Sequence, residues 1–394
     1  VGVLDQLTDA KEYGSILNVE PADWSLLERF IDTAETDAQL SLDSFGLEKT
    51  QGRLHQLMKQ ARAMAQKYDV VVTNPPYMGA SGMNARLSQY VKDHFPDTKS
   101  DLFACFIERG NQMTVKHGYN CMVTMQSWMF LSSFEKMREK ILRTKSITNL
   151  MHMENMVMGI AFGTAVTVFR NDYVTGYKGT YSQIKLQDIE NDEPRVFPVL
   201  ENRFAQTSTD NFSKIPGFPV AYWVSEQFLK VFGSPYTIGT QAAAKKGLTT
   251  SDDATFLRLW YEVPVAAVKF NAQNTDDANL SEAIWFPLNK GGEFRRWYGN
   301  NEYVVNWLNN GQKLRAFSKS VIRNEDYYFR EAVSWNDITS GLVSFRYKAQ
   351  GQIFNDAGPS IFGDNDTLKY LIAMGNSKVM QEICFFITPT IHYT

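Results

Sequence analysis

The segment Asp69-Val-Val-Val-Thr-Asn-Pro-Pro-Tyr77 joins a run of β-branched residues to a stiff, polar turn. Unbroken β-branched character is typical of a strand that is buried on both faces of a parallel sheet. The two prolines lack an N–H and restrict the backbone of the residue before each of them. We therefore expect Asn74 to Tyr77 to form a rigid turn at the carboxyl end of a buried strand, where open α/β sheets place their chemistry.

Helical and strand patterns alternate on both sides of this segment. Apolar residues at helical spacing predict two helices between about Trp24 and Tyr68. After the segment, Ser100-Asp101 is typical of a helix cap, and we expect that helix to end at Lys116-His117-Gly118. Further patterns predict a strand over 119–125, a helix over 133–142, and strands over 147–152 and 164–169. This alternation indicates the α/β class.

The character of the chain changes after Asn171. Prolines and polar residues predict a connecting region that ends near Gly233. Beyond it, short strand patterns and glycines predict a β-rich α+β module. From their sequence context we expect several of its aromatic side chains to be exposed: Trp285, Trp297, Tyr298, Trp307 and Trp335.

The composition is that of a globular protein with two or three domains. The chain has 394 residues, and a domain usually takes about 100 to 200. No window approaches the roughly 18 uninterrupted apolar residues that a bilayer-spanning helix needs, so we expect no membrane role. The formal net charge of −3 disfavours a basic nucleic-acid coat, although a local basic groove is compatible with it.

Cysteine and histidine give no sign of a disulfide framework or of a metal site. The three cysteines are odd in number and lack paired spacing, which fits a reducing cytoplasm. The five histidines lack metal-ligand spacing, and we predict no metal. Because the chain starts at Val1 without an initiator methionine and stops at Thr394 without a cap or polar tail, we expect a fragment.

The turn Asn74-Pro-Pro-Tyr77 has the groups needed to activate an exocyclic amine. The lone pair of such an amine is delocalised into its aromatic ring, so the amine is a poor nucleophile. The Asn74 side-chain oxygen and the Pro75 carbonyl could each accept one amino N–H and hold the nitrogen nearer tetrahedral geometry. Pro76 adds no competing donor, and Tyr77 offers a flat face to a base that has lost its stacking neighbours.

The same tetrapeptide is also compatible with an ordinary turn after a strand, since each of its residues favours loops. The Val-rich strand before it and the surrounding α/β pattern favour the catalytic interpretation.

These segments resemble the later motifs of adenine-N6 DNA methyltransferases in order and spacing. The resemblance rests on Asp69 to Tyr77, the helix after Asp101, Tyr119 to Met125, and Phe162-Gly-Thr-Ala-Val-Thr-Val-Phe169. The second module is similar to the target-recognition domain of large single-chain restriction-modification enzymes and of the BREX phage-defence methyltransferase, the PglX type. The matching stretches of this module begin at residues 246, 289, 327 and 344, with a last one at Pro389-Thr-Ile391. Outside the module, Asp9 to Leu17 resembles the BREX type in particular.

This resemblance implies a function and a division of the chain. It implies methyl transfer from S-adenosylmethionine to a flipped adenine in double-stranded DNA, with Asn74, Pro75, Pro76 and Tyr77 as catalytic residues, and further phage-defence subunits as partners. We accordingly expect a helical segment (1–68), the catalytic half of a methyltransferase domain (69–200), a connector (201–235) and a target-recognition domain (236–394).

One departure from the family affects the methyl donor. No glycine-rich loop of the Asp-Pro-x-x-Gly-x-Gly kind precedes Asn74. In the family that loop follows the first strand and binds S-adenosylmethionine, so no cofactor-binding residue is identified here. The fold is then an incomplete Rossmann-like methyltransferase sheet, and the strand that ends at Thr73 should expose an apolar edge.

Local basic stretches are the candidates for DNA contact in the second module. Residues 240–350 hold 14 Lys or Arg against 12 Asp or Glu, so the module is not generally basic. Lys246 and Thr249 lie beside one glycine, and Lys290, Arg295 and Arg296 surround two more. Glycines let backbone N–H groups approach phosphates, and Arg binds phosphate or guanine bidentately. The alternative is a simple hairpin that carries Trp297 and Tyr298 as core residues.

Two other functions remain compatible with the residues. Protein-glutamine and RNA-guanine methyltransferases also use Asn-Pro-Pro-Tyr, although their catalytic cores do not usually carry so long a carboxyl-terminal module. A truncated chain could instead serve as a non-catalytic DNA-binding subunit.

We predict that the chain alone neither binds S-adenosylmethionine tightly nor methylates DNA, because the glycine-rich loop is missing. Isothermal titration calorimetry of the purified chain should give no micromolar binding, with a cooperative thermal melt as the control for folding. Micromolar binding by the folded chain would contradict this prediction.

Overall fold

The computed structural model describes residues 2–33, 44–157, 159–200, 203–339, 341–387 and 393. The stretch Pro389-Thr-Ile391 quoted above lies outside these residues. The chain divides into two compact units, Val1–Leu229 and Lys230–Thr394, and each is described by itself. Among the described residues, no helix is long and apolar enough to cross a membrane.

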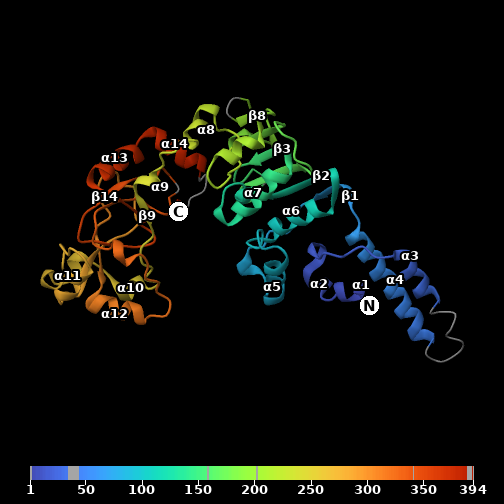
Figure 1. The fold of residues 1–394 in the computed structure, drawn as a ribbon, viewed down its shortest axis with the longest axis horizontal. Coiled ribbons are helices and arrows are strands. Elements are labelled where there is room, and N and C mark those ends of the chain that lie inside the picture. Colours follow the sequence, from blue (N-terminus) through green and yellow to red (C-terminus); the bar gives the residue numbers. More distant parts are fainter. Residues whose placement is uncertain are drawn as a thin grey trace. The chain divides into compact units, whose positions relative to one another are not determined.

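The first unit contains the predicted alternation of helices and strands (Figure 1). Its helices are α1 (Gly2–Gln6), α2 (Ala10–Tyr13), α3 (Trp24–Thr33), α4 (Ser44–Ala65), α5 (Ala85–His94), α6 (Leu102–Met113) and α7 (Glu135–Thr144), while α8 (Glu226–Phe232) crosses into the second unit. Its main strands are β1 (Tyr68–Thr73), β2 (Thr114–Met125), β3 (Ser146–Met153), β4 (Thr164–Arg170), β5 (Lys178–Ile184) and β8 (Phe204–Ser208).

These strands form one sheet in the order β1-β2-β4-β3-β5-β8. β1 and β2 are parallel, whereas β4 is antiparallel to both of its neighbours, β2 and β3. β3 and β5 are parallel again, and β8 closes the sheet in the antiparallel sense. The carboxyl ends of β1, β2 and β3 and the amino end of β4 consequently share one edge.

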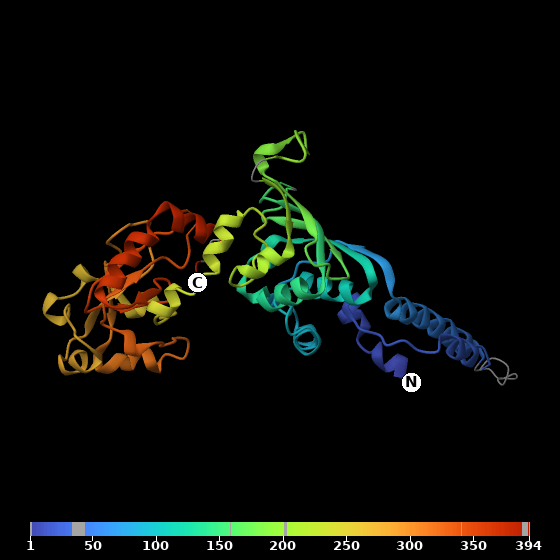
Figure 2. The same ribbon diagram turned by 45° about the horizontal axis from the view of Figure 1, so that its top comes forward.

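The core of the first unit lies between this sheet and α6 and α7, which run along one of its faces (Figures 1 and 2). The helix α6 begins where predicted, because the Asp101 side chain accepts a hydrogen bond from Phe103 N. Amphipathic spacing then turns Phe103 and Ile107 into the core, together with Met137 and Ile141 of α7. The buried aromatic and aliphatic side chains fix both helices against the strands.

Three details of the first unit differ from the expectations. Lys116-His117-Gly118 lies within β2, where Gly118 leaves no room for a side chain beside the Asp69 carbonyl oxygen. The predicted connector 201–235 contributes β8 to the sheet, because its residues pair with β5. The strand β1 is not buried on both faces: Val70 is 55% exposed and Val72 is 70% exposed.

Val70 and Val72 are exposed because their face of the sheet is uncovered near β1. Tyr119, which pairs with Val70 on the interior strand β2, is also 40% exposed, whereas Val71 on the opposite face packs against the core. Among the described strands β1 has β2 as its one neighbour, so it lies at an edge of the sheet, as expected, and carries exposed valines.

Beyond β5, a short antiparallel ribbon of β6 (Ile189–Glu190) and β7 (Glu193–Pro194) projects from the first unit, in light green at the top of Figure 2.

The second unit has two four-stranded sheets and is β-rich, as predicted. One sheet has the order β10-β12-β11-β15 and the other β14-β13-β16-β9. The strands are β9 (Ala243–Lys245), β10 (Leu257–Leu259), β11 (Trp285–Asn289), β12 (Tyr303–Asn306), β13 (Ala332–Ser334), β14 (Arg346–Lys348), β15 (Ile353–Phe354) and β16 (Ser360–Phe362). The helices are α9 (Ile238–Gln241), α10 (Asp253–Phe256), α11 (Thr275–Leu280), α12 (Leu308–Ala316), α13 (Asn365–Gly375) and α14 (Lys378–Ile387).

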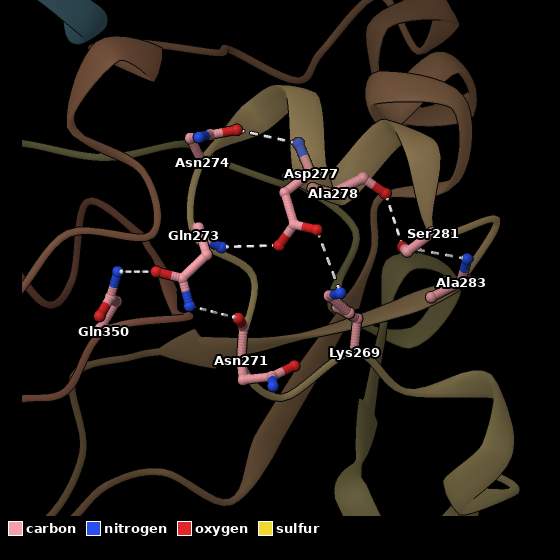
Figure 3. A network of polar contacts seen from close by, with 9 residues as sticks. All are labelled: Lys269, Asn271, Gln273, Asn274, Asp277, Ala278, Ser281, Ala283 and Gln350. Atoms are coloured by element: carbon pink, nitrogen blue, oxygen red, sulfur yellow. Dashed lines mark hydrogen bonds and ion pairs between the residues drawn. The ribbon is translucent and has the colours of Figure 1, made fainter.

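A polar network fixes the start of α11 in the second unit (Figure 3). The Asp277 carboxylate accepts from Lys269 at 3.2 Å and from Gln273 N at 2.9 Å, while Asn274 caps the helix at Asp277 N. Gln350 donates to Gln273 at 2.8 Å and ties this corner to the loop after β14. The network commits Lys269 to a structural ion pair.

The expectation of exposed aromatics in the second unit is partly wrong. Trp307 and Trp335 are buried, with exposed fractions of 1% and 9%. Their flat rings lie in the cores of the unit, since Trp307 packs against Tyr328 and Trp335 against Phe345. Trp297 and Tyr298, in contrast, are 55% and 60% exposed, which excludes the interpretation of these two as core residues.

Candidate active site and DNA-contact residues

The turn of residues 74–77 leaves the end of β1 and is fixed by the cap of α6. The Asp101 carboxylate accepts from Met78 N at 3.0 Å and from Phe103 N at 3.2 Å. Leu102 N donates in turn to Met78 O at 3.0 Å. One carboxylate thus holds both the helix start and the turn, which ties the turn to the core.

Tyr77 anchors the turn in the first unit. Its hydroxyl lies 3.1 Å from the Val123 carbonyl oxygen and 3.1 Å from Asn74 Oδ1, and it can donate to one of them at a time. Its ring contacts Phe103 edge-on, with 6.0 Å between centroids, and Phe162, with 5.7 Å. Burial raises the pKa of Tyr77, so the hydroxyl is a neutral donor.

The acceptors expected to bind an amine lie at the start of the same turn. Asn74 is exposed, whereas Pro75 is buried and Pro76 is exposed. An amide oxygen has two lone pairs, so Asn74 Oδ1 can accept from Tyr77 and from a substrate together. The geometry suits a planar amine, and the roles of these four residues remain predictions.

Phe162 is a further candidate wall residue of this site. It precedes β4, whose amino end shares the sheet edge with residues 74–77, and its ring is inclined at 67° to the Tyr77 ring. Sequence reasoning quoted Phe162 within a motif but assigned it no role. The separation of Phe162 and Tyr77 along the chain does not predict that their rings are in contact.

A buried polar series lies at the same sheet edge. His152, near the end of β3, contacts Gln126 Oε1 through Nε2 and Tyr222 Oη through Nδ1, the latter at 3.3 Å. Burial lowers the pKa of His152 to about 4, so the ring is neutral near pH 7. Since Gln126 Oε1 only accepts, Nε2 carries the hydrogen, and Nδ1 accepts from the Tyr222 hydroxyl. Sequence reasoning missed this series because its members are far apart in the chain.

The described residues do not form a methyl-donor site on their own. β1 is the first described strand, so no strand-to-helix glycine loop precedes it. The four glycines before Asn74 lie in helices or a 3-10 turn: Gly2 in α1, Gly14 in the turn 14–16, and Gly46 and Gly52 in α4. Among the described residues, the turn 74–77 is thus the part of the predicted site that can be located.

In the second unit, Lys246 lines a polar hollow together with Arg323, Asp337 and Asp356, and Thr249 contacts two of these lining residues. Lys246 Nζ lies 3.2 Å from Asp337, and Thr249 Oγ1 donates to Asp356 at 2.6 Å. Arg323, which sequence reasoning missed for lack of neighbouring basic residues, is exposed and donates to Thr249 Oγ1 at 3.3 Å. The hollow thus presents both donors and carboxylates, as a site that reads base edges requires.

Lys290 is held within the second unit. Its ammonium pairs with Asp253 and lies 4.7 Å from the centroid of the Tyr303 ring. The neighbouring Gly291 serves close packing, since a side chain there would meet the Ala357 carbonyl oxygen at 2.2 Å. Both observations explain these residues without a nucleic acid, and the predicted DNA contact of Lys290 stays untested.

Arg295 and Arg296 belong to an exposed aromatic and basic loop, residues 294–298. Arg295 lies 3.8 Å from Glu302 and is half exposed, and Arg296 lies over the Phe294 ring. Trp297 is held by two backbone hydrogen bonds, from its N to Phe345 O and from Tyr347 N to its O. The loop therefore presents cations and aromatic faces from a fixed backbone, which suits contact with nucleic acid.

Comparison with known proteins identifies relatives over nearly the whole chain. Residues 17–157 match the model of the Eco57I restriction-modification methylase family. The chain is 34% identical, over 399 aligned residues, to the adenine-specific methyltransferase BrxX of Escherichia coli O9:H4 (strain HS), covering 98% of this chain and 32% of that protein. It is also 34% identical, over 412 residues, to the adenine-specific methyltransferase PglX of Lacticaseibacillus casei (strain Zhang), covering 99% and 34%. The chain spans about a third of the length of these curated relatives.

Among solved structures, the type IIL restriction-modification enzyme MmeI in complex with DNA is similar, with a TM-score of 0.54 and 12% identity. The match covers 82% of this chain and 45% of that chain. At this identity the likeness shows the fold alone. It confirms the predicted class, an α/β methyltransferase sheet followed by a β-rich unit, and the curated relatives confirm the resemblance to the PglX type.

The buried His152 predicts a pH dependence of stability. Its pKa is about 4 in the folded chain and 6.5 when unfolded, so only the unfolded chain takes up this proton between those values. Stability should therefore fall as pH falls from 6.5 to 4, by about 3 kcal/mol from this group. Urea denaturation at a series of pH values should show this loss in the wild-type chain and less of it in His152→Gln. The exposed His117→Gln serves as control; equal pH dependence in all three would contradict the assignment.

Proposed function

Because the chain is a relative of the adenine-specific methyltransferases BrxX and PglX along almost its whole length, we propose that it is part of a site-specific DNA adenine-N6 methyltransferase. The system would be of the BREX phage-defence or restriction-modification type, and the reaction would occur in the cytoplasm. Double-stranded DNA is the proposed substrate, and further phage-defence subunits are proposed partners. S-adenosylmethionine would supply the methyl group from a site completed by residues other than those described.

The observation that carries the proposal is the fixed turn of residues 74–77. Asn74 Oδ1 and the Pro75 carbonyl would each accept one N–H of the adenine amine, which localises its lone pair. The cap at Asp101 and the hydroxyl of Tyr77 hold this turn before substrate arrives. Such preorganisation avoids the cost of ordering the acceptors during the reaction.

The aromatic side chains beside the turn suit a base that has left the duplex. A flipped adenine loses its stacking neighbours, at a cost of a few kcal/mol. Tyr77 and Phe162, with 5.7 Å between ring centroids, would restore part of this energy. Their contact is edge-to-face, so a base could stack on one ring while it meets the edge of the other.

The second unit is proposed to read the DNA site. Its candidates fall into two groups. One is the hollow with Lys246 and Arg323, beside which Thr249 lies, and the other is the exposed loop of residues 294–298. Arg295 and Arg296 can contact phosphates or guanine edges, and the aromatic rings beside them can stack.

We predict that Asn74→Ala in the full-length protein lowers methyl transfer by about 100-fold or more, because it removes a preorganised acceptor. Tyr77→Phe keeps the ring and should cost about 10-fold or less, the typical effect of one hydrogen bond. The measurement is transfer of labelled methyl groups to DNA, with RNA and protein as competing substrates.

Tyr68→Phe is the matched control, since its hydroxyl binds Ala63 O at the other end of β1. Wild-type turnover by Asn74→Ala, or preferred transfer to RNA or protein, would refute the proposed function.

Replacing both Arg295 and Arg296 by Ala should weaken binding to DNA and reduce the slope of log affinity against log salt by up to about 2, one unit per phosphate contact. Fluorescence anisotropy between about 50 and 200 mM salt measures both quantities. The exposed pair Lys313 and Lys319, replaced together by Ala, controls for loss of charge alone. Unchanged affinity and slope would assign the two arginines a structural role.

A further inference from the structure

The series Tyr222–His152–Gln126 ends against the backbone that carries Phe162. Gln126 N donates to Gly163 O at 3.0 Å. The Gln126 carboxamide lies so close to Gly163 that a side chain there would approach its Nε2 to 2.3 Å. Gly163 directly follows Phe162, so the Gln126 side chain packs against the backbone at the proposed pocket wall.

His152 fixes the orientation of that carboxamide. Its Nε2–H donates to Gln126 Oε1, and this arrangement requires a hydrogen-bond donor at Nδ1. The Tyr222 hydroxyl is that donor. Trp223 stacks on the imidazole at 6.3 Å and Phe130 lies 6.0 Å from it, so the ring has little freedom to turn.

Tyr222 itself is held from the other side. Its ring stacks on Tyr181 at 5.3 Å with an angle of 14°, and Val220 N donates to Met129 O at 2.9 Å. The contacts therefore form a continuous chain from residues 220–223 through His152 and Gln126 to Phe162.

We propose that His152 and Gln126 are positioning residues for Phe162, and that the hydrogen bond from the Tyr222 hydroxyl holds the imidazole in the orientation on which this positioning depends. The inference rests on the proposed function, because it concerns the wall of the base-binding site. None of the three polar side chains needs to touch the substrate; they act through the Gly163 backbone and the angle between Phe162 and Tyr77.

The test is a double-mutant cycle in the full-length protein. Phe162→Ala, Gln126→Leu and the combination of both are compared for methyl transfer and for DNA affinity. If Gln126 acts through Phe162, each single change lowers kcat by about 10-fold or more with little change in DNA affinity, and the combination is no worse than Phe162→Ala alone. Additive losses in the combination, or wild-type kcat for Gln126→Leu, would overturn the proposal.

A smaller change tests the same proposal even if Gln126→Leu fails to fold. Tyr222→Phe removes the hydroxyl alone and leaves Nδ1 of His152 without its donor, so the imidazole is held less firmly against Gln126 Oε1. We expect a lower kcat that is again not additive with Phe162→Ala. The control is Tyr181→Phe, because the Tyr181 hydroxyl is buried on the adjacent stacked ring and has no hydrogen-bond partner among the described residues. Equal kcat for Tyr222→Phe and Tyr181→Phe would overturn the role of the Tyr222 hydroxyl.

A spectroscopic readout separates positioning from a general loss of structure. With 2-aminopurine at the target adenine, flipping raises its fluorescence and stacking on an aromatic wall quenches it. Gln126→Leu should change this signal in the same direction as Phe162→Ala, and Tyr181→Phe should leave it as in the wild type. An unchanged signal in Gln126→Leu overturns the inference, whereas full activity of Asn74→Ala would overturn the proposed function instead.

Discussion

The direction of four strands decides where the candidate site can form. β1, β2 and β3 run one way and β4 runs the other, so three carboxyl ends and one amino end meet at a single edge. Thr164, the first residue of β4, pairs with both Met125 and Met153, the last residues of its two neighbours. The turn after β1, Gln126, His152 and Phe162 gather there as a consequence of backbone pairing, before any side-chain chemistry is considered.

In the second unit, two backbone segments pack directly against each other. A side chain at Gly247 would meet the Phe354 carbonyl oxygen at 1.8 Å, so only glycine allows these two segments to touch. Leu248 N then donates to Phe354 O and Thr249 N to Val321 O, which places Thr249 beside Arg323. This close approach explains Gly247 without a phosphate, and the proposed contact with DNA falls to the side chains that this frame presents.

The sequence was sufficient for features that are local or periodic. The cap at Asp101, the helices α3 and α4 and the turn of residues 74–77 follow from residue types and spacing alone. It was insufficient where the outcome depends on distant partners. Exposure of Val70 and Val72 depends on what covers their face of the sheet, and burial of Trp307 depends on Tyr328. The series through His152 joins residues 126, 152 and 222, a contact that no spacing rule can anticipate.

The exposed valines of β1 lie directly before the turn that carries the proposed catalytic residues. Side chains two residues apart share a face of a strand, so Asn74 continues the face of Val70 and Val72, whereas Val71 and Tyr77 contact the core. Burying a valine side chain contributes roughly 1.5–3 kcal/mol, which favours coverage of this face by an apolar segment. Val72 and Asn74 are two residues apart, so a segment that covered Val72 would come close to Asn74. Coverage of the exposed valines would then also help to enclose the proposed amine-binding acceptors, while Tyr77 is anchored in the core.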